Sequence, residues 1–435
     1  MTKRLFLIIS LVFLVLSGTS LSQTLGLEKD RHKQILKMIR DDVKKNYLDP
    51  TLKGRNIEAD YKNAVEKLEK ATSIGQMSGI IAQFLVDFDD SHLFFVPPSK
   101  ANKTDYGFDF RMVGEKCFIL SVDKDSDAQK KGMQVGDEVF AINDYGPNRE
   151  NLWKMRYYYF SLRPQPFMKV DLIKPDGKQV QLSIEPRIRT GKRVKDLTGA
   201  DINEFIRENE DAYREETKQY YYDTNEGVFI WKMPSFSLDP DKVDNIMGKA
   251  RKYPAIIFDL RGNGGGRVDM VMRLIGNVFD REIKVADEKR RKETKELIAK
   301  TRGKDAFAGK IVILMDSSSA SASEIFSRVL QIEKRGTVFG DQSAGAVMES
   351  RFYANKLGMD VVIFFGASIT VADLIMKDGK SLEKTGVTPD VKMLPGAIDL
   401  AKKRDVVMSK ALESLGITMT PEVAGAMFPE SEDNK

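Results

Sequence analysis

Residues 256–266 read IIFDLRGNGGG, and residues 317–326 read SSSASASEIF. In each stretch an apolar run typical of a buried strand breaks into small residues just before a helical pattern. Small residues free backbone N–H groups to face a ligand, and glycine lets the chain approach a substrate closely. A serine at the start of the second helix lies in the positive field of that helix end and can act as a nucleophile. The two stretches together indicate a serine hydrolase.

The second stretch supplies Ser321 as the candidate nucleophile. The N–H of Ala322 can point at an oxyanion that forms beside the Ser321 hydroxyl, and Gly264 or Gly265 can supply the second donor. The alternative is that a serine of this run only caps the helix. Phosphate binding is not indicated, because the glycine run lacks the Gly-Lys-Ser/Thr ending of a P-loop and the spacing of a dinucleotide fingerprint.

Both stretches belong to residues 227–420, where apolar strands and helical patterns alternate. The expected strands are residues 228–233, 255–260, 311–315 and 361–365. This alternation predicts an α/β core around a mostly buried sheet. Residues 189–226 are polar and charged, and we expect them to form a helical connector. Residues 421–435 end in an acidic run, and we expect a flexible tail.

Residues 104–188 change to short strands, with strand-like runs at 116–122, 168–173 and 179–184. Within them, residues 132–143 read GMQVGDEVFAIN, which resembles a PDZ domain. The resemblance implies that a peptide adds as a strand and that its carboxylate is held by a loop of free N–H groups. The matching loop contains Gly107, Phe108, Asp109 and Phe110. Asp109 stands where a second glycine is common, so we expect it to repel a peptide C-terminus; the domain could instead serve as a spacer or lid.

The bulk composition favours a globular protein of several domains. The chain has 435 residues, 42% of them apolar and 31% charged, with a net charge of +5. The charges are interspersed, so a nucleic-acid surface is not indicated. Residues 1–23 combine a basic start, a short apolar run and a small-residue exit, as a secretory signal peptide does. We therefore expect export to the periplasm or the extracellular space, with an uncleaved membrane anchor as the alternative; the oligomeric state stays open.

Residues 24–100 carry apolar side chains at helical spacing and end in a Ser91-His92 pair. A serine nucleophile needs a base, and His92 is the better of the two histidines, because His32 lies among charges on what we expect to be an exposed helix. Cys117 is the one cysteine and stands in an apolar stretch, so we expect an inert buried thiol. Two histidines and one cysteine exclude a multi-histidine or cysteine-based metal centre.

The two opening motifs, with the PDZ-like segment before them, resemble the C-terminal processing (tail-specific) serine proteases and their tricorn-like relatives. The resemblance covers about residues 87–394 and implies a ClpP/crotonase-like α/β protease core with an inserted PDZ-like domain. In the family the nucleophile is the serine three residues before the glutamate of the signature, which is Ser321 here. The implied oxyanion donors are the N–H groups of Ala322 and of the Gly264-Gly265 turn.

One departure from the family pattern points to the base. Tail-specific members carry a lysine in the segment after the nucleophile helix, and Ala346 occupies that position here. Tricorn-like members use a Ser-His pair upstream and a glutamate downstream, and this chain has Ser91-His92 and Glu383. The resemblance thus implies a tetrad in which His92 is the base for Ser321, Ser91 orients His92, and Glu383 orients Ser91.

These observations predict an exported serine endopeptidase that acts on protein or peptide substrates and uses no metal or other cofactor. Two alternatives remain open at this point. The scaffold could bind a peptide or a lipid without cleaving it, or the same oxyanion hole could serve a non-proteolytic acyl hydrolase.

Overall fold

The computed structural model describes residues 25–98, 102–190, 218–224, 226–358 and 362–428. The predicted signal peptide and most of the predicted connector lie outside these residues. Chain contacts divide the protein into two compact units; the first comprises residues 1–99, 158–164 and 350–371, and the second comprises residues 100–157, 165–349 and 372–435. None of the helices in the described ranges has the length and apolar character needed to cross a membrane.

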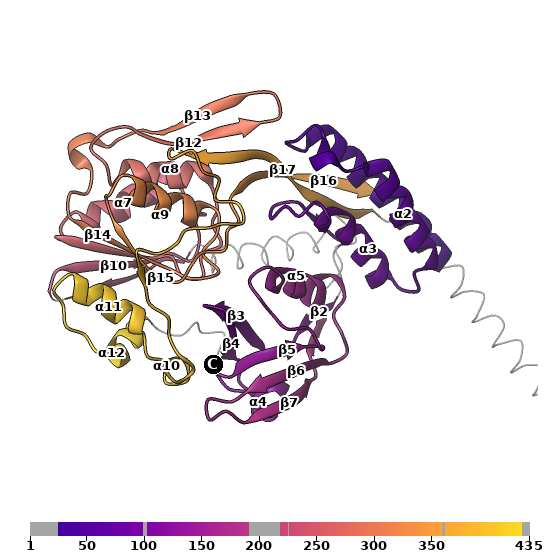
Figure 1. Ribbon diagram of the computed structural model, residues 1–435, viewed down its shortest axis with the longest axis horizontal. Helices are drawn as coiled ribbons and strands as arrows, with labels where there is room; N and C mark the ends of the chain where they lie inside the picture. The colour runs from indigo at the N-terminus through magenta and orange to yellow at the C-terminus, as the bar shows by residue number, and fades with distance from the viewer. Residues whose placement is uncertain (1–24, 99–101, 191–217, 225, 359–361, 429–435) are drawn as a thin grey trace, which may run out of the picture. The chain divides into compact units, whose positions relative to one another are not determined.

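The second unit is built on a six-stranded sheet (Figure 1). Its order is β18-β15-β14-β11-β10-β9, and every neighbouring pair is parallel except β10 with β9. The strands are β9 (Tyr220–Asp223), β10 (Val228–Lys232), β11 (Ala255–Asp259), β14 (Lys310–Met315), β15 (Thr337–Gly340) and β18 (Val391–Lys392).

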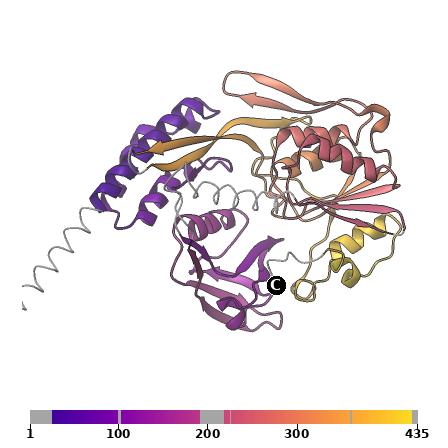
Figure 2. The same ribbon diagram turned by 180° about the vertical axis from the view of Figure 1, so that it is seen from behind.

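Helices cover both faces of this sheet, as Figures 1 and 2 show. Successive strand residues point to opposite faces, so both faces of a central strand must be apolar. Ile256 and Phe258 pack with α7 (Pro240–Ala250), α8 (Val268–Gly276) and α9 (Ala322–Ile332), whereas Ile257 packs with α11 (Val406–Ser414) and α12 (Pro421–Gly425). The continuous apolar runs that predicted buried strands are thus divided between two cores.

A second sheet holds the strands that the sequence pattern did not resolve. Its order is β1-β17-β12-β13, with β16 paired to β17. β17 is far longer than the predicted strand at 361–365, and it contributes residues to both units. The strands are β1 (Phe94–Val96), β12 (Ile283–Arg290), β13 (Thr294–Ala299), β16 (Met348–Leu357) and β17 (Ile363–Met376).

A five-stranded antiparallel sheet, β3-β4-β5-β6-β7, falls within the range predicted to be PDZ-like. The predicted strands at 116–122, 168–173 and 179–184 coincide with three of its members; the PDZ assignment itself stays a prediction. Its elements are β3 (Phe108–Val113), β4 (Lys116–Val122), α4 (Asp127–Lys130), β5 (Glu138–Ile142), α5 (Leu152–Arg156), β6 (Met168–Ile173) and β7 (Gln179–Ile184); β2 (Asn102–Asp105) pairs separately with β8 (Arg187–Thr190).

The first unit packs helices against the outer parts of β16 and β17. A helix over residues 25–46 is followed by the 3-10 turn η1 (Leu52–Gly54), α2 (Ile57–Lys70) and α3 (Ile74–Val86). Most of the π-helix η2 (Tyr157–Leu162), from later in the chain, belongs to the same unit. β1 then pairs antiparallel with β17, with Phe94 opposite Ser368. This pairing anchors the end of the segment that carries Ser91 and His92.

Two expectations about exposure are wrong. His32 is only 2% exposed, because it continues the helical stripe that buries Ile35, Leu36 and Ile39. The chain also stays folded past residue 421, where α12 begins. Ala424 and Met427 are buried against α11, so the described part of the predicted flexible tail is anchored by apolar contacts.

Candidate active site

The candidate nucleophile lies at a strained turn. Ser321 is the N-cap of α9 and has φ 53° and ψ −116°, a left-handed backbone that residues other than glycine rarely adopt. The N–H of Glu324 donates to the backbone carbonyl of Ser321 at 2.9 Å, and the Ser321 side chain makes no capping hydrogen bond. The hydroxyl therefore does not satisfy the helix end, which was the alternative to a catalytic role. Strain of this kind gathers at functional sites.

The glycine loop lies directly against this turn. A Cβ built on Gly265 would come within 2.7 Å of Ser321 Cβ, 2.9 Å of the Ala320 oxygen and 3.1 Å of the Ala322 nitrogen. No side chain fits at this position, and Gly265 also has φ +103°. The contact explains why two stretches separated by about fifty residues both end in small side chains.

Some backbone N–H groups near Ser321 already donate a hydrogen bond, and others do not. The Gly265 N–H donates to Asn263 Oδ1 at 2.9 Å. The N–H groups of Gly264 and Ala322 have no hydrogen-bond partner among the described residues. Gly264 and Ala322 are therefore the better candidates for an oxyanion-binding pair, whereas the Gly265 N–H is already used by Asn263.

Asn263 joins the two loops, and the sequence analysis gave it no role. Its side chain is fully buried; Nδ2 donates to the Met233 carbonyl at 2.9 Å, while Oδ1 accepts from Gly265. Its backbone oxygen accepts from the Ala320 N–H and the Ser323 hydroxyl, each at 3.0 Å. An asparagine inside a glycine run was the available signal, because its side chain readily bonds to the backbone two residues on.

Glu324 connects the nucleophile turn to residues 343–346. Its buried carboxylate accepts from the Ser321 N–H at 2.9 Å, and it also accepts from Ser343, Gly345 and Ala346. The Ser321 N–H also donates to the Ala346 carbonyl at 2.9 Å. Ala346, at the position of the family's lysine, thus contacts the nucleophile turn through its backbone alone.

Glu383 is held beside the same segment. Its Oε2 accepts from the Val347 N–H at 3.0 Å. The next residue, Lys384, donates its N–H to the Gly345 carbonyl at 2.7 Å. Ser321 and Glu383 are therefore bonded to adjacent residues of one segment, Ala346 and Val347.

The Ser91-His92 pair belongs to the first unit, and a buried aspartate organises it. Asp90 is 2% exposed and accepts hydrogen bonds from the hydroxyls of Tyr47 at 2.8 Å and Thr370 at 2.6 Å, and from the His92 N–H at 3.0 Å. Ser91 Oγ lies 2.8 Å from His92 Nδ1. This contact leaves Nε2 as the nitrogen for proton transfer. The sequence analysis gave Asp90 no role.

Burial shifts the pKa values of His92 and Cys117 in the directions that their expected roles require. Burial lowers the pKa of His92, and the nearby Asp90 charge opposes this shift only in part. A neutral imidazole at neutral pH suits a general base. By contrast, burial raises the pKa of the Cys117 thiol to about 12, which favours the unreactive form expected for it.

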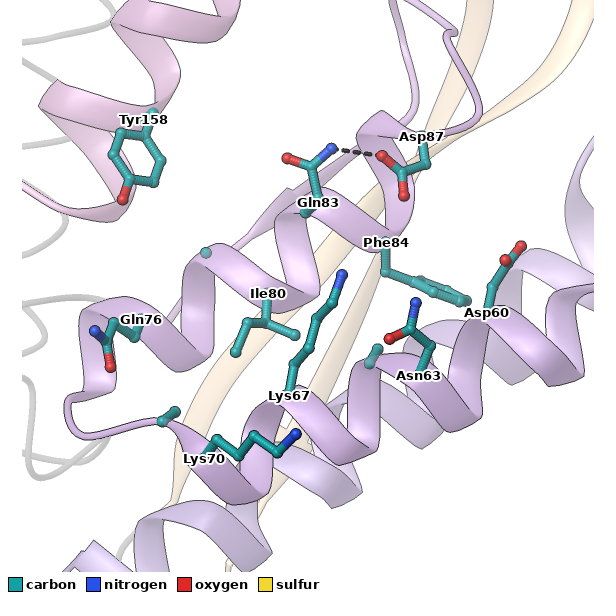
Figure 3. Close-up of a pocket in the computed structure, with 13 residues that line it drawn as sticks. Asp60, Asn63, Lys67, Lys70, Gln76, Ile80, Gln83, Phe84, Asp87 and Tyr158 are labelled. Atoms are coloured by element: carbon teal, nitrogen blue, oxygen red, sulfur yellow. Dashed lines mark hydrogen bonds between the residues drawn. The ribbon is translucent and has the colours of Figure 1, made fainter.

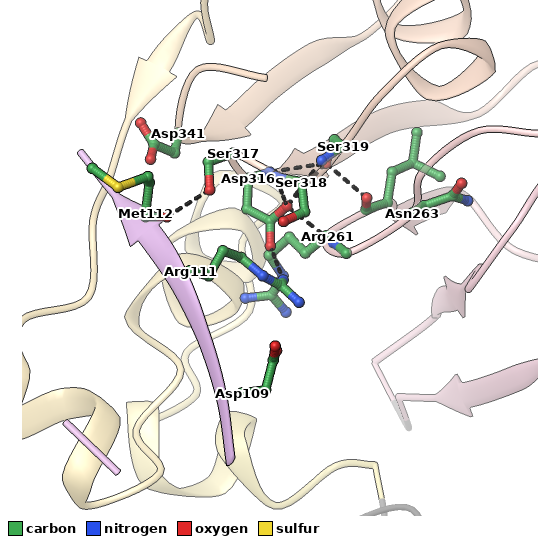
Figure 4. A network of polar contacts seen from close by, with 12 residues as sticks. Asp109, Arg111, Met112, Arg261, Asn263, Asp316, Ser317, Ser318, Ser319 and Asp341 are labelled. Carbon is green, nitrogen blue, oxygen red and sulfur yellow. Dashed lines mark hydrogen bonds and ion pairs between the residues drawn. The ribbon is translucent and has the colours of Figure 1, made fainter. Parts of the chain in front are cut away.

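A polar cluster ties the PDZ-like sheet to the loop before the nucleophile, and Figure 4 shows it. Asp316 accepts from the Gly262 N–H at 3.0 Å and forms an ion pair with Arg111 on β3. Ser317 Oγ donates to the Met112 carbonyl at 2.6 Å. Sequence reasoning missed these contacts, because about two hundred residues separate the partners.

The predicted carboxylate-binding loop is partly occupied by its own chain. The Gly107 N–H donates to Asp105 Oδ1 at 2.8 Å, and the side chains of Phe108 and Phe110 are buried. Asp109 is paired with Arg156, whose guanidinium also donates to the Phe110 carbonyl at 2.8 Å. Arg156 offsets the repulsion expected from Asp109, whereas Asp105 removes one free donor, so capture of peptide C-termini stays a prediction.

A separate groove lies within the first unit between α2 and α3. Its volume is about 420 Å³. Figure 3 shows Lys67 and Lys70 from α2 and Gln83 from α3 among the side chains that line it. The lining contains no serine, cysteine or histidine, so we do not place the chemistry there. Within the described ranges, no group of three or more His, Cys, Asp or Glu side chains is placed to hold a metal ion.

Comparison with known proteins identifies the core. The model of peptidase family S41 matches residues 228–393, which run from the first residue of β10 to just beyond β18. This region contains the glycine loop, Ser321 and Glu383. The predicted resemblance to C-terminal processing (tail-specific) serine proteases is confirmed over the matched region.

Relatives and solved structures agree with this match. A probable CtpA-like serine protease of Staphylococcus epidermidis is 24% identical over 293 residues, which are 66% of this chain and 52% of that protein. The tail-specific protease of Haemophilus influenzae is 26% identical over 231 residues, or 51% of this chain and 32% of that protein. The chain thus spans about half the length, or less, of these two relatives. The structure of mature CPAF complexed with lactacystin has a TM-score of 0.64 at 15% identity, covering 91% of this chain and 98% of that chain. This likeness confirms the predicted α/β multidomain fold.

Proposed function

We propose that this chain, whose residues 228–393 match the model of peptidase family S41, is an exported serine endopeptidase with a Ser-His-Ser-Glu tetrad. The observation that carries the proposal is the turn at Ser321. It holds a hydroxyl in a strained backbone against Gly265, beside two backbone donors, Gly264 and Ala322, that have no partner among the described residues. This arrangement is what acyl transfer needs: a nucleophile and a preformed site for the oxyanion.

In the proposed reaction the Ser321 hydroxyl attacks a peptide carbonyl. His92 Nε2 takes the hydroxyl proton and returns it to the leaving amine, and water activated by His92 then releases the acyl-enzyme. Ser91 accepts the Nδ1–H of His92, consistent with their 2.8 Å contact. In the proposed tetrad the Ser91 hydroxyl then donates to Glu383. The Gly264 and Ala322 N–H groups stabilise the tetrahedral oxyanion. Residues 1–23 direct export, and the PDZ-like domain assists substrate binding or gates access.

The test uses the full chain with Ser321→Ala, His92→Ala and, as a matched control from the same serine run, Ser318→Ala. We expect the first two variants to lose cleavage of an unfolded protein such as casein while they keep the wild-type circular dichroism spectrum. Ser318→Ala should cleave normally. Retained cleavage in both Ser321→Ala and His92→Ala would reject the assignment.

A serine-reactive phosphonate separates the proposed enzyme from its alternatives. Labelling at Ser321, located by mass spectrometry, is expected for a hydrolase. A folded wild-type chain that is neither labelled nor active would instead indicate a peptide- or lipid-binding protein. A panel of ester and peptide substrates then distinguishes an endopeptidase from an acyl hydrolase that cleaves esters alone.

A further inference from the structure

We propose that Glu324 is a positioning residue for the nucleophile and that peptide hydrolysis requires its carboxylate to be ionised, so that it can bind Ser321 and residues 343–346 at once. The inference rests on the function proposed above. It adds a residue that acts on the nucleophile turn without contacting the substrate.

The nucleophile turn needs an external restraint. Ser321 has φ 53°, which is strained for a residue that carries a side chain. Its N–H is bound on two sides, by the Ala346 carbonyl at 2.9 Å and by Glu324 Oε2 at 2.9 Å. Removal of these acceptors would let the turn relax, and the hydroxyl would move from its place beside Gly265.

The Glu324 carboxylate is saturated with donors. Oε1 accepts from Ser343 Oγ at 2.5 Å and the Gly345 N–H at 2.8 Å, while Oε2 accepts from the N–H groups of Ser321 and Ala346 at 2.9 and 3.0 Å. Glu324 itself is fully buried. Two oxygens with two donors each match the accepting capacity of an ionised carboxylate.

Protonation of this carboxylate conflicts with its surroundings. A carboxylic acid has a proton to donate, yet three of its four partners are backbone N–H groups that cannot accept one. The added proton must therefore displace at least one donor or reverse the Ser343 hydroxyl. Burial raises the pKa of Glu324 to about 7 although the four hydrogen bonds act to lower it. Both protonation forms are therefore populated near neutral pH.

Ser343 extends the same network to Glu383. Its hydroxyl donates to Glu324 and accepts from the Val387 N–H at 2.6 Å, while its own N–H donates to the Val387 carbonyl at 3.2 Å. Glu383 precedes Val387 in that loop. One buried carboxylate thus holds the nucleophile turn and, through Ser343, the loop that carries a second member of the proposed tetrad.

Other charged groups lie on the elements packed around Glu324. Glu383 and Lys384 belong to the loop that bonds to residues 343–347. Asp341 precedes that segment and is paired with Arg149. Asp316 follows β14 and is paired with Arg111. Since both aspartates have cationic partners, the test must separate Glu324 from Glu383 and from His92.

The experiment measures the rate of phosphonate labelling of Ser321 against pH in the full chain. In wild type the labelling rate should rise roughly tenfold between pH 6 and pH 8, with a midpoint close to pH 7. The rise that comes from deprotonation of His92 should have its midpoint at lower pH, because burial lowers the pKa of His92. Ser343→Ala removes a hydrogen bond that favours the ionised form, so its midpoint should move to higher pH. Glu324→Gln should be labelled slowly at every pH and should lack the rise centred near pH 7. Glu324→Asp should recover part of that rise.

Ser327→Ala is the matched control. Ser327 is a fully buried serine of α9 whose hydroxyl bonds to the Ser323 carbonyl, and it contacts neither Glu324 nor residues 343–346 through a hydrogen bond. Its profile should equal that of wild type. A folded Glu324→Gln variant with the wild-type rate and pH profile would overturn the inference, as would an unshifted midpoint in Ser343→Ala.

Hydrogen exchange keeps this inference separate from the proposed function. At pH 8, where the wild-type carboxylate is ionised, amide protection factors in residues 341–348 should be lower in Glu324→Gln than in wild type. A chain with this exchange pattern but no labelling at Ser321 would retain the role of Glu324 in holding the turn and reject the hydrolase. A chain that is labelled but in which Glu324→Gln keeps the wild-type protection would do the reverse.

Discussion

Replacement of Gly265 by alanine tests the contact on which the site depends. The new Cβ would lie 2.7 Å from Ser321 Cβ, closer than real Cβ atoms approach any neighbour. The φ of +103° adds backbone strain of about 1–3 kcal/mol for a residue with a side chain. Overpacking against the Ala320 oxygen and the Ala322 nitrogen adds about 1–3 kcal/mol. We therefore expect the free energy of unfolding to fall by about 2–6 kcal/mol.

Gly264→Ala is the natural comparison, because the two glycines are adjacent. A Cβ on Gly264 meets nothing within 4 Å, and its φ lies outside the left-handed region. Its free energy of unfolding should change by less than about 1 kcal/mol. Both variants keep the backbone N–H. A difference in their free energies of unfolding therefore comes from the close contacts and the φ of Gly265, and not from a lost hydrogen-bond donor.

The assay is urea denaturation followed by circular dichroism, paired with casein cleavage. Displacement of Ser321 by about 1 Å should lower the cleavage efficiency of Gly265→Ala by about 100-fold, and Gly264→Ala should lose much less. Equal denaturation midpoints for the two variants would refute the proposed close approach of the glycine loop to the nucleophile turn.

Three further predictions follow from the same contacts. Asn263→Ala leaves the Met233 carbonyl and the Gly265 N–H without their partner, so it should lower the free energy of unfolding by about 2–4 kcal/mol in urea denaturation; an unchanged midpoint would argue against the bridge. Asp90→Ala removes the acceptor that the buried hydroxyls of Tyr47 and Thr370 share and should cost a similar amount, about 2–4 kcal/mol, while lowering activity through His92. Because the pKa of Glu324 is raised to about 7, its contribution to stability is present below about pH 4.5 and is lost as pH rises through 7, a change of up to about 3 kcal/mol that Glu324→Gln should abolish in the pH series.

The pattern of apolar residues predicted the parts of the fold that depend on local sequence. The helix from Ala322 and the buried strands of the core lie where the runs of apolar and small residues indicated. The hairpin of β12 and β13 was missed, because its strands are rich in charged residues and depend on pairing with each other and with β17. His32 was placed on the surface because its neighbours are charged, although its helical position is buried.

The candidate site also contains residues that could be predicted from the sequence and residues that could not. Ser321 and the glycine loop could be found from sequence, since a nucleophile turn requires small residues on both sides. The partners that hold them could not, because Glu324 acts through the backbone of residues 343–346 and Arg111 reaches Asp316 across about two hundred residues. Backbone N–H donors leave no mark on residue identity, and a distant ion pair leaves none on local sequence, so such contacts appear only in the folded chain.

The contact at Ala346 bears on how a protease family can change its base. This residue bonds to the nucleophile turn only through its peptide N–H and carbonyl, which every residue except proline carries. A different side chain could be installed here without loss of either hydrogen bond. The position can therefore mutate between alanine and a functional side chain while the scaffold around Ser321 persists. A change of proton acceptor needs, besides the substitution at this point, a base on another segment, the place that His92 takes in the proposed tetrad.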